Sequence, residues 1–361
     1  MFFNALSCYR IDETAFAMDA LRAALAARPC PPIGGLDWKV EGFVAPYQES
    51  GLVFPGNDMI GEHECVLIAL RREEKVLPAG VIRDAVDTKV QEIERTEMRK
   101  VDRKEKLALK EQITDDLLPR AFSRASRLAA MVDRKSGWLL INTATASRAE
   151  GLVSAVREAL PPFPALLPRT VVPPVSAMTE WVASGAAPEG FELGDSCVLA
   201  EPQESGARAR LQRVDLTQNL AREMVASGYQ VRELGLVWRE QVAFSLTDAL
   251  RLRRLQFLDL LQEEASQAED VESLHMATLT IAAGAMRQLL DSLVGCLGGV
   301  NGASDMLLDD AMRVVRAVGG RVDETLLQRH LDIGYNRAGR LLEELGRIGV
   351  LEKQAQGWAV A

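Results

Sequence analysis

The sequence predicts an α+β body followed by a small winged helix-turn-helix domain. Helical and strand patterns mix through residues 1–297 without the regular strand–helix–strand rhythm of a doubly wound sheet, which favours the α+β class. Three glycines then fall within five residues, so 298–304 is expected to form a flexible linker. The last segment, 305–361, contains three helical patterns and a hairpin, which together indicate a winged helix.

Composition excludes several classes of protein. The 361 residues are 48% hydrophobic and 26% charged, as in a globular chain of two or three domains. Because 51 acidic residues outnumber 42 basic ones, the net charge is −9, and any binding of nucleic acid must depend on local charge. The five cysteines and three histidines are too scattered for a disulfide framework or a metal cluster, and we expect neither metal nor cofactor. No apolar stretch reaches the ~20 residues that cross a bilayer, so we expect a soluble, cytoplasmic protein.

The expected elements of the body follow from periodicity and from turn residues. Strands are expected at 2–11, 38–46, 64–71, 120–132, 137–143, 191–200, 208–214, 230–238 and 241–246, and helices at 13–27, 79–118, 147–160, 178–183 and 271–297. The helix over 79–118 is long because its apolar stripe continues until Pro119 stops it. The strands at 120–132 and 137–143 are expected to form a hairpin that turns at Asp133–Gly137, and Ser147 is the expected N-cap of the helix that follows it.

The last segment has a compact pattern of its own. Helices are expected at 306–318, 323–331 and 335–346, and strands at 348–353 and 356–361, with Asp323 capping the second helix. The buried face of the third helix is expected to comprise Ala338, Leu341, Leu342, Leu345 and Ile348. Its outer face then comprises Asn336, Arg337, Arg340 and Glu343.

The outer face of that third helix has two interpretations. In a helix-turn-helix this face enters the major groove, where arginine pairs with guanine, asparagine with adenine and glutamate with cytosine. Alternatively it is a solvated face on which Arg340 pairs with Glu343 or Glu344. Spacing alone leaves both interpretations open, because many winged helices bind protein instead of DNA.

The run Gln328–Leu345, with Ile333-Gly334-Tyr335-Asn336-Arg337-Ala338 at its centre, closely resembles the gamma domain of the DNA translocase FtsK. The resemblance covers nearly all of 306–361. It implies that the third helix reads short G-rich polar DNA sequences and that the domain can contact the XerD tyrosine recombinase. The sequence departs from the family at Gly339, where alanine is usual, and in a short uncharged wing. No Walker A motif is present, so the motor itself is absent.

The strongest local charge in the body lies between Lys89 and Lys135, with thirteen basic and nine acidic residues. On the long predicted helix this mixture is more typical of a solvated face than of a DNA track. Beyond it, Arg120, Phe122 and Arg124 alternate and are expected on one side of a single strand. An aromatic ring between two guanidinium groups suits phosphate binding with stacking. The other interpretation, which the pattern alone favours somewhat, buries Phe122 in the core with both arginines at its rim.

A second alternating cluster occurs further along the chain. Arg208, Arg210 and Gln212 are expected on one side of a strand, and Arg213 on the other. A third small group of arginines follows at 251–254.

Several segments of the body resemble the RdgC family of bacterial recombination-associated DNA-binding proteins. The matching runs are Arg72–Pro78, Leu117–Arg124, Thr179–Val182, Val214–Thr217, Leu236–Trp238 and Leu297–Gly299, which together cover about 1–299. The resemblance implies an α+β half-ring without enzymatic activity that dimerises around duplex DNA, without sequence preference, and restrains RecA-driven recombination in the nucleoid. It places Phe122 on a fingertip near the DNA or the ring gate. It also aligns Arg213 with a functional lysine and Val214 with a glutamine.

These observations combine into one hypothesis. Duplex DNA is expected to contact Arg120, Phe122, Arg124, Arg208, Arg210, Gln212 and Arg213 in the body, and Asn336, Arg337, Arg340 and Glu343 in the winged helix. A dimeric ring with a basic bore reconciles DNA binding with the negative net charge, since binding depends on local phosphate neutralisation. One rival makes the tail a docking module for a tyrosine recombinase. Another is a nuclease that uses the scattered carboxylates, although no catalytic motif is visible.

Overall fold

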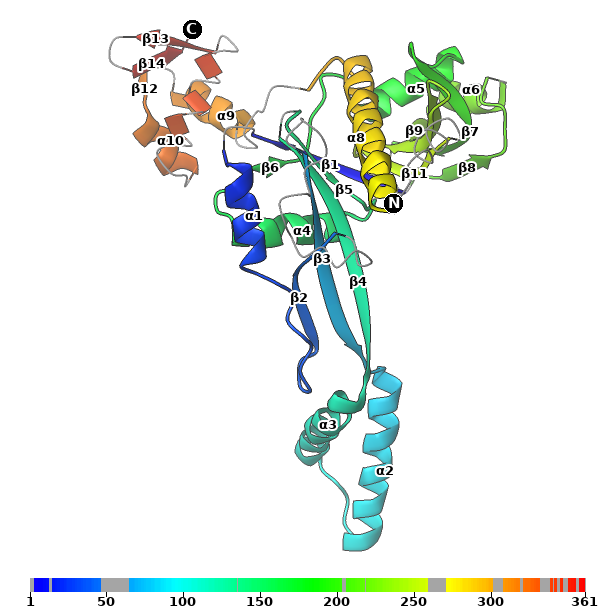
Figure 1. Ribbon diagram of the computed structural model, residues 1–361, viewed down its shortest axis with the longest axis vertical. Helices are drawn as coiled ribbons and strands as arrows, with labels where there is room; N and C mark the ends of the chain where they lie inside the picture. Colours follow the sequence, from blue (N-terminus) through cyan, green and yellow to red (C-terminus); the bar gives the residue numbers. More distant parts are fainter. Residues whose placement is uncertain are drawn as a thin grey trace. The chain divides into compact units, whose positions relative to one another are not determined.

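The structure is a computed structural model that divides into two compact units (Figure 1). One unit comprises Met1–Pro168 and Val172–Gly298, and the other comprises Arg169–Val171 and Gly299–Ala361. The structure describes residues 3–12, 15–46, 65–134, 136–202, 206–217, 219–258, 271–300, 308–318, 321–331, 338–339, 341–342, 345–346, 350–354 and 357–360. None of the described helices is both long and apolar enough to cross a membrane.

The first unit is built on one antiparallel sheet, which contains eleven strands among the described residues. Its order is β2-β3-β4-β5-β1-β11-β10-β9-β7-β8, and β6 pairs with β1. The strands are β1 (Leu6–Ile11), β2 (Lys39–Val44), β3 (Cys65–Val76), β4 (Phe122–Asp133), β5 (Trp138–Ile141), β6 (Ala165–Leu166), β7 (Phe191–Ala200), β8 (Arg208–Gln212), β9 (Gln230–Trp238), β10 (Val242–Thr247) and β11 (Arg251–Phe257). The expected ranges of β7 and β9 are reproduced, and the mixture of long antiparallel strands with helices confirms the α+β class.

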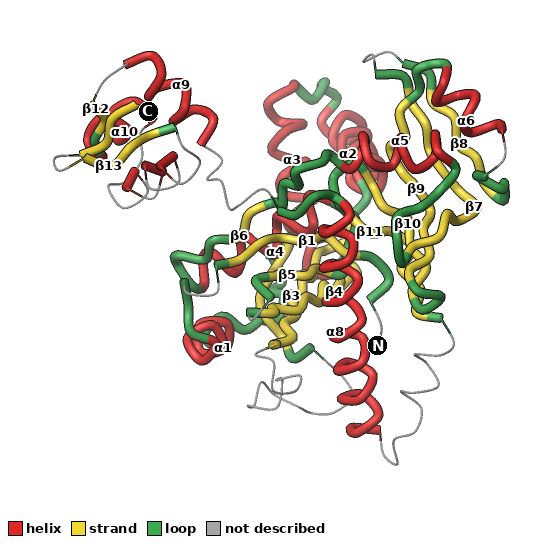
Figure 2. The backbone as a smooth tube through the Cα atoms, turned by 90° about the horizontal axis from the view of Figure 1, so that it is seen from above, coloured by secondary structure: helices red, strands yellow, loops and turns green. Residues whose placement is uncertain are grey.

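The helices of this unit pack against the sheet or extend one of its hairpins. They are α1 (Met18–Ala26), α2 (Ala79–Glu97), α3 (Arg103–Leu117), the 3₁₀ helix η1 (Leu118–Arg120), α4 (Ala146–Ala159), α5 (Pro174–Ser184), α6 (Asn219–Ala226) and α8 (Val271–Cys296). Figure 2 shows α5 and α6 beside the strands β7–β9, and the backbone N–H of Val231 donates to Thr179 Oγ1 of α5 at 3.0 Å. The α6 helix and β11 are absent from the sequence-based prediction.

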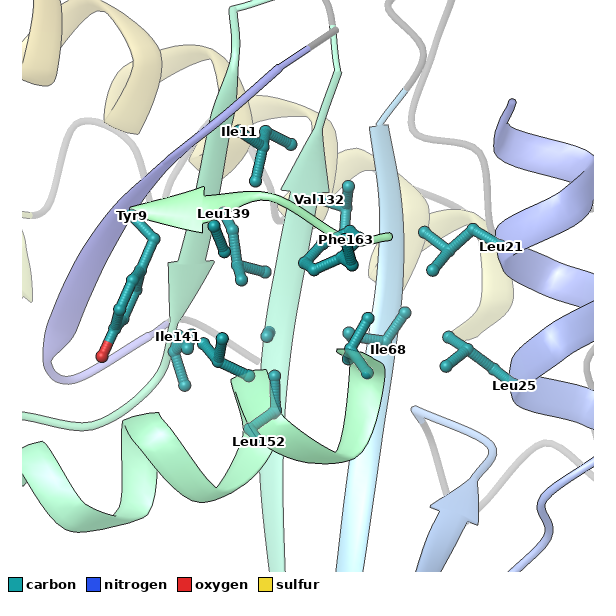
Figure 3. Packing of buried hydrophobic residues seen from close by; sticks show 14 of the residues in the cluster. Tyr9, Ile11, Leu21, Leu25, Ile68, Val132, Leu139, Ile141, Leu152 and Phe163 are labelled. Atoms are coloured by element: carbon teal, nitrogen blue, oxygen red, sulfur yellow. The ribbon is translucent and has the colours of Figure 1, made fainter. Parts of the chain in front are cut away.

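A hydrophobic core fixes α1 and α4 on the half of the sheet that contains β1 and β3–β5 (Figure 3). Leu21 and Leu25 of α1 and Leu152 of α4 are fully buried, and they pack with Ile68 and Leu139 of the strands. Each such side chain stabilises the fold by about 1.5–3 kcal/mol through burial. The α4 helix begins after Thr145, so the prediction of Ser147 as N-cap is wrong by two residues.

The single helix predicted over 79–118 is wrong, because the segment forms two helices. Met98 adopts a left-handed conformation, with φ of 53°, that ends α2. Asp102 then caps α3, since its carboxylate accepts a hydrogen bond from the Glu105 N–H at 2.7 Å. The two helices are joined by an ion pair between Lys106 and Asp87 at 2.7 Å. No residue of α3 is buried, as expected for a solvated charged face.

A buried ion pair holds α8 on the sheet. Arg287 of α8 donates from Nε and Nη2 to Asp133 Oδ2 at 2.8 and 2.6 Å, and Nη2 also lies 3.2 Å from Cys65 Sγ. The Asp133 side chain is only 2% exposed. Burial, with a further contribution from the Asp133 carboxylate, raises the pKa of the Cys65 thiol to about 12, so this cysteine stays protonated at neutral pH.

The second unit comprises α9 (Leu308–Val318), β12 (Arg321–Val322), α10 (Glu324–Leu331), β13 (Leu351–Gln354) and β14 (Gly357–Val360). Its three described strands form an antiparallel sheet in the order β12-β14-β13. As expected, Asp323 caps α10 by accepting from the Leu326 N–H at 2.8 Å. Of the apolar face predicted for the third helix, Ala338, Leu341, Leu342 and Leu345 are fully buried, and Ile348 lies outside the described residues.

Part of the predicted linker is hydrogen-bonded within this unit. The Val171 N–H donates to the Gly299 carbonyl at 3.1 Å, and Thr170 forms a bridge with Val300. The remainder of the predicted linker, 301–304, lies outside the described residues. Gly346 is required where it stands, because a Cβ there would overlap the ring of Trp358.

The Arg287–Asp133 pair yields a stability prediction. Asp133→Ala leaves a guanidinium without its partner in a mostly buried setting and should lower the free energy of unfolding by about 3 kcal/mol or more. The matched control is Lys106→Gln, which breaks an exposed pair and should cost less than about 1 kcal/mol. Urea unfolding followed by circular dichroism measures both. Equal, small effects of the two substitutions would show that Asp133 does not anchor α8.

Candidate nucleic-acid interface

The predicted cluster on β8 is exposed as the alternation requires. Arg208, Arg210 and Gln212 are exposed, while Ala209 and Leu211 between them are partly buried. Since β8 is the last strand of the sheet order, its three polar side chains lie along a sheet edge. Arg213 follows the strand in a left-handed conformation, with φ of 55°, and is also exposed.

Two of these residues line an open groove of about 640 Å³ in the first unit. Arginines from three strands contribute to it: Arg208 and Arg210 from β8, Arg232 from β9, and Arg251 and Arg253 from β11. The carboxylates in its lining are Glu201, Glu233 and Asp248. The formal charge of this lining is therefore positive, although the whole chain is negative. We refer to this feature as the arginine groove.

Strand register explains how these residues meet. Arg210 pairs with Val198, Val198 with Glu233, and Glu233 with Thr247, so these four positions form one row across β8, β7, β9 and β10. Side chains directly opposite in an antiparallel ladder point to the same face. Arg251 follows this row just after the turn into β11, where it pairs with Ser7 of β1. The groove thus follows one face of the sheet from its edge strand β8 to β11.

Two β-bulges add charges to this face. One step along β7 between Val198 and Leu199 corresponds to two steps on β9, which leaves Arg232 as the extra residue. A second bulge on β11 places Arg254 in a left-handed conformation with φ of 52°. Both Arg253 and Arg254 are exposed, which a regular strand would not allow for neighbouring residues of a half-buried sheet.

Glu233 is the central carboxylate of the groove. Its side chain is 9% exposed and accepts from Arg253 Nη1 at 2.9 Å and from Arg254 Nη2 at 2.7 Å. Burial alone would raise the pKa of Glu233, but the hydrogen bonds from Arg254 and Arg253 outweigh it and hold the pKa below its ordinary value. Glu233 is therefore ionised at neutral pH.

The remaining arginines of the groove differ in their pairing. Arg232 forms a looser pair with Asp248, at 3.6 Å, on the exposed surface. Within the described ranges, no carboxylate forms an ion pair with Arg208, Arg210 or Arg251. Three guanidinium groups of the groove therefore have free hydrogen-bonding capacity, whereas Glu233 holds Arg253 of the lining and Arg254 beside it.

The structure separates the first predicted cluster from this groove. Arg120 belongs to η1, so the prediction that it shares a strand with Phe122 and Arg124 is wrong; Pro119 lies within the same 3₁₀ helix, and β4 begins only at Phe122. Phe122 is 88% exposed, which also contradicts its interpretation as a core residue. It opens β4 opposite Val76, where β3 ends, beyond the part of the hairpin covered by core residues. Arg124 forms an ion pair with Glu74 across the same ladder.

The predicted DNA-reading residues of the tail, Asn336, Arg337, Arg340 and Glu343, lie outside the described residues.

Sequence reasoning missed Arg232, Glu233 and Asp248 as members of the groove. A usable signal was the adjacent pair Arg232-Glu233 within an otherwise apolar strand. In the part of the chain that the structure describes, no three His, Cys, Asp or Glu side chains lie close enough together to hold a metal ion.

The architecture defines an α+β protein with an arginine-lined groove and a second unit of helices and a small sheet. A family model described as "Putative exonuclease, RdgC" matches residues 1–300, and a second, described as "Ftsk gamma domain", matches residues 302–357. The chain therefore belongs to the RdgC family and has a tail of the FtsK gamma type, a winged-helix domain, as the sequence led us to expect.

Relatives named "Recombination-associated protein RdgC" cover the body of the chain. The one from Laribacter hongkongensis is 46% identical over 303 residues, the one from Neisseria meningitidis serogroup C 44% over 302, and the one from Pseudomonas putida 39% over 303. Each alignment covers 83% of this chain and 98–99% of the relative. The tail thus extends beyond the region shared with these relatives.

The Glu233 ion pairs predict a pH dependence of stability. Because the folded-state pKa of Glu233 lies below the ordinary value of 4.5, the unfolded chain takes up this proton first as the pH falls. Glu233→Gln should lower the free energy of unfolding by about 1–2 kcal/mol near neutral pH. Below about pH 4.5 the difference from the wild type should shrink. Urea titrations across this range test the prediction, and a difference that does not change with pH contradicts it.

Proposed function

We propose that this chain is a non-enzymatic, double-stranded DNA-binding protein whose body contacts the phosphate backbone through the arginine groove. The observation that carries the proposal is the convergence of five arginines from β8, β9 and β11 on one face of one sheet. A guanidinium group offers paired N–H donors that match two phosphate oxygens. Phosphate contacts position a protein on DNA without reading its sequence. The groove therefore supports binding that is independent of sequence.

We also propose that two copies form a ring around the duplex and that the complex modulates RecA-dependent recombination. The relatives' shared name, which describes a recombination-associated protein, supports the pathway. The contrast between a net charge of −9 and a basic groove supports a surface that faces DNA while the exterior stays acidic. Light scattering with and without a short duplex tests the ring. A mass of one chain under both conditions contradicts it.

We further propose that the winged-helix tail adds a preference for G-rich polar motifs through Asn336, Arg337, Arg340 and Glu343. The match to the FtsK gamma domain supports this role. Tethering the tail to a body already bound to DNA raises its effective concentration there to roughly millimolar for a short linker. Docking of a tyrosine recombinase on the same domain is the alternative, because the resemblance implies both partners.

The nuclease alternative is tested directly, since the family description contains the word exonuclease. Plasmid and linear duplex are incubated with the full chain and added Mg²⁺. We expect intact DNA. Metal-dependent cleavage that copurifies with the protein and disappears on chelation would overturn the non-enzymatic proposal.

Salt dependence distinguishes the contributions of Arg210 and Phe122. The apparent affinity for duplex should fall steeply between about 50 and 200 mM salt, and Arg210→Gln should reduce the log–log slope by about 0.9, since one phosphate contact is lost. Phe122→Ala should weaken binding with little change in slope, because the uncharged phenyl side chain neutralises no phosphate and so releases no counterion. Fluorescence anisotropy of a labelled duplex measures both variants. A wild-type response that is flat with salt contradicts phosphate binding by the groove.

The tail is tested with Arg340→Ala in the full chain. Loss of one guanine contact should weaken binding to G-rich motif duplexes by about 1–3 kcal/mol and leave binding to scrambled duplexes unchanged. The control is Arg329→Ala, which alters an arginine of the preceding helix α10. Unaltered DNA preference together with lost capture of a tyrosine recombinase would support the docking alternative instead.

A further inference from the structure

The arginine groove contains a carboxylate, Glu233, that forms ion pairs with two neighbouring arginines. Glu233 lies in the middle of the cross-strand row and holds Arg253 and Arg254 at 2.9 and 2.7 Å. Both guanidinium groups remain about half exposed, at 50% and 52%, while the carboxylate is only 9% exposed. The arginines therefore face the solvent, and their counter-charge lies beneath them.

The bulge on β11 is what makes this arrangement possible. A regular strand would direct Arg253 and Arg254 to opposite faces, so only one of them could reach Glu233. The extra residue of the bulge leaves both side chains exposed, and both reach the same carboxylate. Arg254 thus adopts a left-handed backbone conformation, and Glu233 forms ion pairs with two arginines.

We propose that Glu233 acts as an internal competitor for DNA phosphate, which holds Arg253 and Arg254 and so limits the affinity of the groove. The inference rests on the proposed function and adds to it a positioning residue. A phosphate entering the groove binds directly to Arg208, Arg210 and Arg251, which no described carboxylate pairs. To bind Arg253 or Arg254 it must displace a hydrogen bond to a carboxylate in a poorly solvated position, where such bonds are stronger than in water.

The test is Glu233→Gln in the full chain, assayed by anisotropy with a labelled duplex across a salt series. Gln keeps the shape of the side chain and one acceptor oxygen but removes the negative charge. We expect the log–log salt slope to steepen by about 1 to 2 and the affinity at low salt to rise about tenfold, since each released arginine adds about one phosphate contact. A residue with a structural role alone would weaken binding or leave it unchanged when altered.

Glu201→Gln is the matched control. It removes the same charge from the lining of the same groove, but the Glu201 side chain holds no arginine among the described residues. We expect less than half of the Glu233→Gln effect. Equal effects of the two substitutions would mean that only net charge matters and would overturn the special role of Glu233.

A second pair of variants does not depend on the stability of Glu233→Gln. Arg254→Gln and Arg210→Gln each remove one exposed arginine, the first held by Glu233 and the second unpaired. Arg254→Gln should leave the slope unchanged, and Arg210→Gln should reduce it by about 0.9. Equal reductions would overturn the inference alone. No reduction from either variant, with DNA still bound, would overturn the proposed groove itself.

Discussion

The repulsion among guanidinium groups on one face of one sheet is the constraint on which the groove depends. No described carboxylate forms an ion pair with Arg208, Arg210 or Arg251. Glu233 pairs with two further arginines, Arg253 and Arg254. Like charges this close destabilise a fold unless a counter-charge is near. A nearly buried glutamate supplies it from below, so the cations keep their exposure to solvent. The same carboxylate stabilises the fold and competes with an anionic ligand.

Strand pairing explains why the groove lies where it does. The row that joins Arg210 to Glu233 crosses two strand pairings, and the bulges at Arg232 and Arg254 add charged neighbours to it. Bulges redirect side chains and are frequent beside functional sites. The elongated β3–β4 hairpin, by contrast, ends in an exposed Phe122 and in the charged helices α2 and α3. Two different parts of the first unit thus carry candidate DNA contacts.

The sequence correctly predicted the regular helices and strands of this molecule in several places. Alternation identified β7, β9 and the exposed face of β8, and apolar periodicity identified the buried face of the third tail helix. It failed where the backbone leaves its regular geometry. The break at Met98 was missed although Asp102 and Glu105 have capping spacing, and β11 was missed because its bulge interrupts the alternation. Bulges depend on tertiary pairing, so the meeting of Glu233 with Arg253 and Arg254 had no local signal beyond the charges themselves.

The central claim is that duplex DNA occupies the arginine groove, and hydrogen–deuterium exchange of the full chain with and without a short duplex tests it most directly. Edge strand β8 and the turn between β10 and β11 are expected to exchange more slowly in the complex, because bound DNA shields their exposed backbone. The hydrophobic core around α4 should not change. Protection confined to the tail or to the end of the β3–β4 hairpin, with β8 unaffected in a saturated complex, would contradict the account.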